Sequence, residues 1–145
     1  MSQALRERWE ALYRQAEYRV LLYPEPLVFR IGHYEAQIER RLLAASAFQR
    51  ECCILTACNP GSAITDAALN QRYSDELREQ IAMSGLRSIA ALNIDPSRTW
   101  PDEPGFLLID ADRQRVIELG RHFQQNAIVS ITLGQAPSLI WLDSL

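Results

Sequence analysis

Glu51-Cys52-Cys53-Ile54-Leu55-Thr56-Ala57-Cys58-Asn59-Pro60-Gly61-Ser62 is the stretch of sequence that decides the predicted fold. Its first part, 51–58, is an apolar run of strand length, and 59–62 combines residue types that end strands in turns. Apolar residues at four-residue spacing follow, and they predict a helix over 65–84 with Thr65 as its N-cap. The stretch therefore predicts a strand, a turn and a helix that returns along the strand.

The chain after this helix continues in the same alternating way. Residues 95–104 contain three prolines, which argues against regular structure and predicts a loop. The other predicted elements are strands over 86–93, 105–109, 127–132 and 137–142, and a helix from Asp110 or Asp112 to about 123. The order β-α-β-β-α-β predicts an α+β fold with a ferredoxin-like split βαβ core and an extra C-terminal strand. A different mixed α/β sheet is the alternative.

Three further elements precede this core. They are a helix over 3–21, a strand over 27–31 and a helix over 34–47. A chain of 145 residues suits one hydrophobic core, so we expect a single domain over 1–145. Within it, residues 1–24 would carry a loosely attached N-terminal helix and 25–145 would form the α/β core.

Charge and hydropathy narrow the classes of function. Residues 1–50 carry eight arginines and six acidic residues, a net charge of +2. Residues 51–145 carry seven arginines and twelve acidic residues, a net charge of −5. Neither half offers the basic surface that nucleic acid requires. No apolar run approaches the length of a membrane span, and the N-terminus lacks the apolar stretch of a secretory signal. We therefore expect a cytoplasmic protein that binds neither nucleic acid nor membranes.

The absence of lysine and the small number of cysteines and histidines limit the catalytic and metal-binding chemistry that the chain can perform. All fifteen basic residues are arginines, which excludes Schiff-base, pyridoxal-phosphate and P-loop chemistry that needs a lysine of this chain. Adjacent Cys52 and Cys53 would point to opposite faces of a strand, and His33 and His122 are far apart. We therefore expect no metal site and no cofactor.

Chain direction predicts where the polar residues meet. If the strand over 51–58 runs upward, the turn 59–62, the loop 95–104 and the segment 124–126 all lie at the top end of the sheet. The helix over 65–84 would begin there, and its free N–H groups would favour an anion. This end is the predicted site for a small molecule.

Each candidate residue has a predicted role at that site. Glu103 would act as a general acid or base if burial raised its pKa. Arg98 or Arg121 would clamp a carboxylate or a phosphate. Trp100 would offer a flat apolar surface. The remaining ligand-binding candidates are Asn59, Ser62, Asn70, Gln125 and Asn126.

A structural role is the alternative for every one of these residues. The asparagine, serine and glutamine side chains could complete turns and helix caps, and Trp100 could cover the core. A Cys58–His122 pair would place a thiol near a helix N-terminus, but apolar burial is the commoner fate of a strand cysteine.

Three motifs resemble a bacterial family known only as domain of unknown function 3293. They are Thr56-Ala57-Cys58-Asn59-Pro60-Gly61-Ser62 followed by Asn70, Trp100-Pro101-Asp102-Glu103-Pro104-Gly105-Phe106, and Phe123-Gln124-Gln125-Asn126-Ala127-Ile128-Val129. The resemblance covers about 25–132 and implies no reaction. It implies that Asn59, Pro60, Ser62, Asn70, Trp100, Glu103 and Asn126 are signature positions. The sequence departs from it at Cys58, where an aromatic residue is expected, and at Gly105, where a small polar one is.

Three hypotheses about function follow. The first is a binding module or a metal-independent enzyme for a small anionic or nucleotide-like ligand, with Glu103 and Asn59 at its centre. The second is a protein-interaction or regulatory module that forms a homodimer or binds a partner through residues 3–21 or through the C-terminal strand with Trp141. In the third, the polar signature is purely structural.

Overall fold

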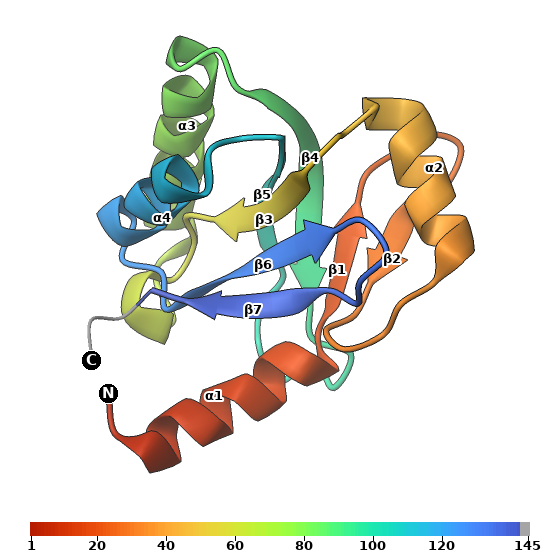
Figure 1. Cartoon of the computed structure of the whole chain (residues 1–145). Coiled ribbons are helices and arrows are strands. Elements are labelled where there is room, and N and C mark those ends of the chain that lie inside the picture. The colour runs from red at the N-terminus through yellow and green to blue at the C-terminus, as the bar shows by residue number, and fades with distance from the viewer. Residues whose placement is uncertain (143–145) are drawn as a thin grey trace.

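A computed structural model describes residues 1–142 as an α+β structure with a curled, seven-stranded antiparallel sheet (Figure 1). The helices are α1 (Gln3–Gln15), α2 (Ala36–Ser46), α3 (Ala67–Met83) and α4 (Arg113–His122), and the 3-10 turn Pro60–Ser62 precedes α3. The strands are β1 (Glu17–Val20), β2 (Leu27–Phe29), β3 (Glu51–Thr56), β4 (Arg87–Ile94), β5 (Glu103–Ile109), β6 (Ala127–Thr132) and β7 (Ser138–Trp141).

The strands lie in the order β2-β1-β4-β5-β3-β6-β7, and every neighbouring pair is antiparallel. The predicted α+β class is therefore confirmed. The four strands that alternate with α3 and α4 occupy the centre of this order as β4-β5-β3-β6. Strands β1 and β2 extend the sheet beyond β4, and β7 extends it beyond β6.

The sheet has an apolar core on each of its two faces. Helices α3 and α4 cover one face, where Leu77 and Val116 pack against Leu55 of β3. The opposite face carries Ile54 of β3 and packs against Leu42 of α2. Because successive strand side chains point to opposite faces, β3 is buried on both, which explains its continuous apolar run.

The predicted helix over 3–21 is wrong beyond Gln15, where α1 ends. Ser2 is the N-cap of α1, and its hydroxyl accepts a bond from the Leu5 N–H. Residues 17–20 form β1, which pairs with β2 and with β4. Their burial alternates, with Tyr18 and Val20 turned to the core, and this two-residue period is that of a strand.

Two boundaries next to the turns also differ from the prediction. Strand β5 begins at Glu103 instead of 105, because Glu103 and Pro104 pair with β4 opposite Asn93 and Leu92. The loop therefore spans 95–102. Helix α3 is capped by Asp66, whose carboxylate accepts a bond from the Ala68 N–H, and not by Thr65.

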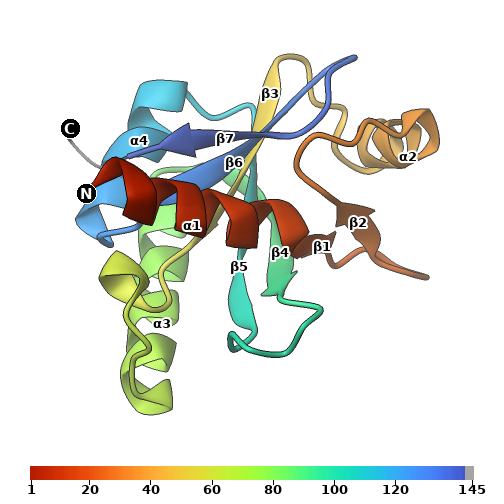
Figure 2. The same cartoon turned by 90° about the horizontal axis from the view of Figure 1, so that it is seen from below.

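Helix α1 lies across the sheet on the face opposite α3 and α4, as the view from below shows (Figure 2). None of its residues is fully buried, so the helix rests on the sheet without entering the core. Among the described residues, no helix combines the length and the apolar character that a membrane crossing requires.

Candidate functional site

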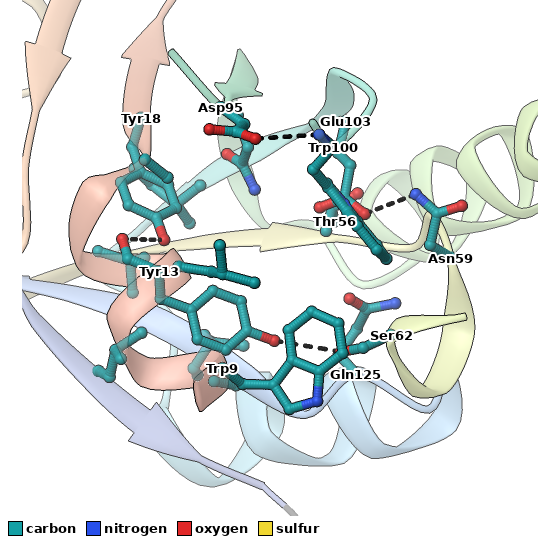
Figure 3. Close-up of a pocket in the computed structure, with 18 of the residues that line it drawn as sticks. Trp9, Tyr13, Tyr18, Thr56, Asn59, Ser62, Asp95, Trp100, Glu103 and Gln125 are labelled. Carbon is teal, nitrogen blue, oxygen red and sulfur yellow. Dashed lines mark hydrogen bonds between the residues drawn. The ribbon is translucent and has the colours of Figure 1, made fainter. Parts of the chain in front are cut away.

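A cavity lies between α1 and the sheet, and we call it the α1 cavity (Figure 3). It is lined by Trp9, Leu12, Tyr13, Ala16, Tyr18, Ile54, Thr56, Asn59, Ser62, Asn93, Ile94, Asp95, Trp100, Glu103, Gln125, Ala127, Ile128, Val129 and Leu139. The space open to the centres of water molecules is about 70 Å³, whereas one water needs roughly 10–15 Å³ by the same measure. The cavity therefore has room for a small organic molecule.

The polar floor of the cavity follows from strand register. Tyr18 of β1 lies opposite Asn93 of β4, and Asn93 lies opposite Glu103 of β5. Residues directly opposite each other on neighbouring strands have side chains on the same face, with Cβ atoms about 4.5–5.5 Å apart. The three side chains therefore form a row across β1, β4 and β5.

Glu103 holds a carboxylate in a largely desolvated position in this row. Burial raises the pKa of Glu103 above its usual value, although the side chains of Asn59 and Trp100 act in the opposite direction by bonding to the carboxylate. The amide Nδ2 of Asn59 donates to Oε2 of Glu103 over 2.7 Å. Within residues 1–142, no arginine or histidine forms an ion pair with Glu103.

Asn93 lies beside Glu103 in this row. Its Oδ1 atom is buried and has no hydrogen-bond partner among the described residues. An unpaired buried acceptor costs free energy, because the oxygen has lost its water and gained nothing in return. Since almost none of its surface is accessible, this oxygen does not face the open space of the cavity.

Asp95 shapes the loop that carries Trp100. Its carboxylate accepts bonds from Ser97 and Thr99, through both the backbone N–H and the hydroxyl of each, and from the Trp100 N–H. These bonds lower the pKa of Asp95 to about 2. The loop in turn sets the Trp100 ring edge-on against Trp9 of α1, with the ring centroids 5.5 Å apart. Asp95 therefore positions one wall of the cavity.

Asn59 and Asn70 hold the turn that follows β3. Asn59 is 3% exposed and adopts a left-handed backbone conformation, with φ of 50°. Its N–H donates to Oδ1 of Asn70 over 2.8 Å, and its own Oδ1 accepts bonds from the Thr65 N–H and from Nδ2 of Asn70. Asn70 therefore fastens the turn and does not itself line the α1 cavity.

Ser62, Gln125 and Asn126 join the same turn to the segment before β6. Asn126 donates from Nδ2 to the Ser62 hydroxyl over 2.5 Å, and Gln125 donates from Nε2 to the Cys58 carbonyl over 3.0 Å. Ser62 and Gln125 line the cavity, whereas Asn126 supports it from behind. The three polar segments expected at one end of the sheet are thus joined by hydrogen bonds.

The structure does not bring the predicted arginines into the cavity. Arg98 is exposed and pairs with Asp102 over 3.1 Å, and Nε of Arg121 donates to the Leu142 carbonyl. Of the residues in 1–142 that line the cavity, none is an arginine or a histidine. The N-terminus of α3 is occupied by Asp66. The described residues therefore offer no cationic group for the anion that we expected from the sequence.

Cys58 and His122 lie in different surroundings. The Cys58 thiol is 3% exposed and contacts the Ser74 hydroxyl and the Pro104 carbonyl. The exposed His122 ring bonds to Glu76 over 3.2 Å. Among the described residues, no hydrogen bond joins the thiol to the imidazole, so the geometry gives no support to the pair. Within residues 1–142, no three histidine, cysteine or acidic side chains gather as metal ligands would.

Sequence reasoning missed most of the residues that line the cavity. Tyr18 and Asn93 lie in β1 and β4, Asp95 directly follows β4, and the partners of these strands could not be read from one sequence. Trp9 and Tyr13 belong to α1, which we expected to be loosely attached. One signal was available for Asp95, because the run Asp95-Pro96-Ser97-Arg98-Thr99 is typical of an Asx-type turn.

Fold and site together define a small α+β protein with a carboxylate on the floor of an aromatic-walled cavity. The chain belongs to the family described as protein of unknown function (DUF3293), whose model matches residues 55–128. This match confirms the family resemblance, over a shorter range than the expected 25–132. All seven signature positions lie inside it. No curated protein and no solved structure matches the chain.

Proposed function

We propose that this chain binds a small organic molecule in the α1 cavity, with Glu103 as the group that recognises the polar part of the ligand. A carboxyl group with a raised pKa that faces a cavity is also suited to proton transfer, so Glu103 is the residue we assign to acid–base chemistry. The activity, if the ligand is a substrate, is metal-independent in this proposal.

One observation carries the proposal. Glu103 keeps a carboxylate in a desolvated cavity without an arginine or histidine partner among the described residues. A purely structural role would require only the bonds from Asn59 and Trp100, which a glutamine at position 103 could also accept. The charge itself is therefore unexplained by the fold, and a ligand would explain it.

The polar turn beneath the cavity supports the same proposal by a different route. Asn59 and Asn70 satisfy each other and Thr65, so their role is to hold Glu103 in place rather than to contact a ligand. In this proposal Asn59 is a positioning residue, and Trp100, Ser62 and Gln125 belong to the walls.

The interaction-module hypothesis has less support. Trp141 is engaged inside the molecule, with Tyr13 at 5.7 Å between ring centroids and the Arg6 guanidinium 4.7 Å above its ring. The apolar face of α1 is turned toward the sheet. A homodimer or partner complex through either element would have to displace these contacts.

Three broader expectations also stand as proposals. We propose a ferredoxin-like split βαβ core, which the order β4-β5-β3-β6 supports, and a single domain that includes α1, which the contacts of Trp9 and Tyr13 support. A cytoplasmic location is supported by three free, buried cysteines, which suit a reducing compartment.

The experiment that tests the proposed function uses the tryptophans as reporters, because Trp9 and Trp100 line the cavity and Trp141 touches Tyr13. A chemically diverse fragment library would be screened by tryptophan fluorescence and thermal shift. A ligand at a hundred times its Kd stabilises the native state by about 2.7 kcal/mol.

Two alanine-to-leucine variants make this screen specific to the cavity. Ala127→Leu places a larger side chain in the α1 cavity, and Ala44→Leu makes the same change on the exposed surface of α2. We expect hits that bind the wild type and Ala44→Leu but not Ala127→Leu. A library without such hits, or hits that Ala127→Leu leaves unchanged, would contradict the proposal.

A further inference from the structure

We propose that the ligand of the α1 cavity carries a small cationic hydrogen-bond donor, an amine or an amidine, that binds at the Glu103 carboxylate. This inference rests on the proposed function and names the chemical class of the ligand. It follows from the charges that line the cavity, from the position of the Glu103 carboxylate and from the nature of the walls.

The side-chain donors that line the cavity are largely engaged with the protein itself. The Thr56 hydroxyl donates to the Pro104 carbonyl, the Tyr18 hydroxyl to the Tyr13 carbonyl, and the Gln125 amide to the Cys58 carbonyl. An anionic ligand needs donors or cations, and the described lining residues include no arginine or histidine. The cavity is therefore poorly equipped for an anion.

The acceptors show the opposite pattern. Of the two lining carboxylates, Asp95 is saturated by donors from its own loop, which leaves Glu103 as the negative charge available to a ligand. A ligand with a cationic N–H group would supply the opposite charge that the described lining residues do not give Glu103.

The Glu103 carboxylate also keeps acceptor capacity for a ligand. Its two oxygens have about four lone-pair sites. The bonds from Asn59 and Trp100 use two of them. A cationic N–H group in the cavity can therefore bind to the same carboxylate.

The walls of the cavity suit a cation as well. Trp9, Tyr13, Tyr18 and Trp100 line it, and aromatic faces attract cations through the ring quadrupole. Figure 3 shows the Trp9 and Tyr13 side chains reaching from α1 toward the sheet, on the side of the cavity opposite Glu103. An apolar body attached to the cationic group would lie against these rings.

The test uses four probes of similar size and different charge: benzamidine and benzylamine, which are cations, benzamide, which is neutral, and benzoate. Binding to the full-length protein would be measured by tryptophan fluorescence and by protein-detected NMR. We expect the two cations to bind at least about tenfold more tightly than benzamide and benzoate, since a hydrogen bond between charged groups is stronger than one between neutral groups.

Two neighbouring acids provide the matched variants. Glu103→Gln removes the charge in the cavity and keeps the shape of the side chain, whereas Asp102→Asn removes the adjacent charge, which faces Arg98 outside the cavity. We expect Glu103→Gln to weaken the cations by about tenfold or more and Asp102→Asn to leave them unchanged. Thermal unfolding of each variant shows that it is folded.

Two kinds of contrary outcome separate the inference from the proposed function. If benzamide or benzoate binds as tightly as the cations, or if Glu103→Gln binds the cations as well as the wild type does, the ligand class is wrong while the cavity remains a binding site. If none of the four probes binds, both the ligand class and the proposed function are contradicted.

Discussion

Among the described acidic residues, Glu103 is the one whose pKa its environment raises. Burial removes water from the carboxylate, and the hydrogen bonds from Asn59 and Trp100 compensate only in part. The carboxylate of Asp95, only a loop away, is stabilised by bonds from three residues and titrates at an abnormally low pH. The two acidic residues therefore have different roles: Asp95 stabilises the loop that carries Trp100, whereas the Glu103 carboxylate faces the cavity.

Glu103→Gln should increase stability at neutral pH. A carboxyl group whose pKa is raised in the folded state binds protons more readily in that state than in the unfolded one. Its contribution to the stability of the fold is therefore fully present below the unfolded pKa and is lost as pH rises through the folded pKa. We therefore expect the variant and the wild type to converge below about pH 4.5. Above it, the variant should become the more stable of the two. Urea unfolding at several pH values measures this difference.

The opposite result would favour the structural interpretation of the signature. If Glu103→Gln is less stable than the wild type by the same amount at every pH, the charge of Glu103 serves the fold and not a ligand. Asp102→Asn is again the control, because its exposed ion pair with Arg98 should contribute little at any pH.

Asn59 should contribute to stability through both its backbone and its side chain. Asn59→Ala removes the bonds to Glu103, Thr65 and Asn70 and also places alanine at φ of 50°, which asparagine tolerates better. We expect a loss on the order of 1–3 kcal/mol from the bonds. Asn59→Gly loses the same bonds without the strain and should be up to about 1 kcal/mol more stable than Asn59→Ala. Equal losses in chemical denaturation would show that the backbone conformation contributes nothing.

The residues on the floor of the cavity show the limit of sequence reasoning at this scale. Glu103, Asn59 and Trp100 stand out because each directly precedes a proline, and chain direction alone places them at one end of the sheet. Asn93 gives no such signal, since its importance comes from lying opposite both Tyr18 and Glu103. Register between strands that are distant in sequence cannot be read from one chain.

Among the elements, those with one clear hydrophobic period could be predicted from the sequence. A segment that fits both the helical and the strand period could not. Strand β6 begins and ends where the sequence predicts, at 127 and 132. Residues 17–20 were misread because Val20 fits both the helical spacing of α1 and the alternation of a strand. Pairing with β2 and β4 decides in favour of the strand, and this pairing is a tertiary interaction.

Gly105 in β5 should be essential for the pairing of β5 with β3. A Cβ atom at this position would lie 2.4 Å from the Leu55 carbonyl oxygen, which belongs to the backbone of β3. Neither strand can move away, because β5 also pairs with β4. We expect Gly105→Ala to destabilise the protein by about 1–3 kcal/mol, as overpacking in a core does.

Gly120 of α4 provides the comparison for Gly105. A Cβ atom there would lie 2.3 Å from a methyl group of Leu142, which is the end of a flexible side chain. Alanine also favours a helix by up to about 1 kcal/mol relative to glycine. Gly120→Ala should therefore cost less than Gly105→Ala in urea unfolding. The reverse order would mean that β3 and β5 can adjust more easily than the side chain of Leu142.

In the whole molecule, the cavity exists only because α1 crosses the sheet. Its floor includes side chains of β1, β3, β4 and β5, its walls include the loop after β4 and the turn after β3, and α1 covers it. Figure 2 shows α1 lying across the strands. No single segment contains the site. The sequence could place the polar turns together, but it could not place a half-exposed helix over them, since nothing in an amphipathic pattern says which surface it covers.

Removal of residues 1–15 should leave a folded protein with an open cavity, whereas removal of residues 1–22 should not fold. The first truncation deletes α1, which contains no fully buried residue. The second also deletes β1, with Tyr18 and Val20 from the core and the only strand between β2 and β4. We expect dispersed NMR spectra and cooperative unfolding for the protein that lacks residues 1–15, but not for the protein that lacks residues 1–22.

Ligand binding by the protein that lacks residues 1–15 then tests whether α1 contributes to the binding site. If α1 supplies the aromatic wall, the truncated protein should lose most of its affinity for probes that bind the full chain, because Trp9 and Tyr13 are gone while Glu103 and Asn93 remain. Undiminished affinity would place the ligand outside the α1 cavity. If residues 16–145 do not fold, α1 is part of the core despite its exposure, and the free energy that holds the helix on the sheet is larger than its edge-on aromatic contacts suggest.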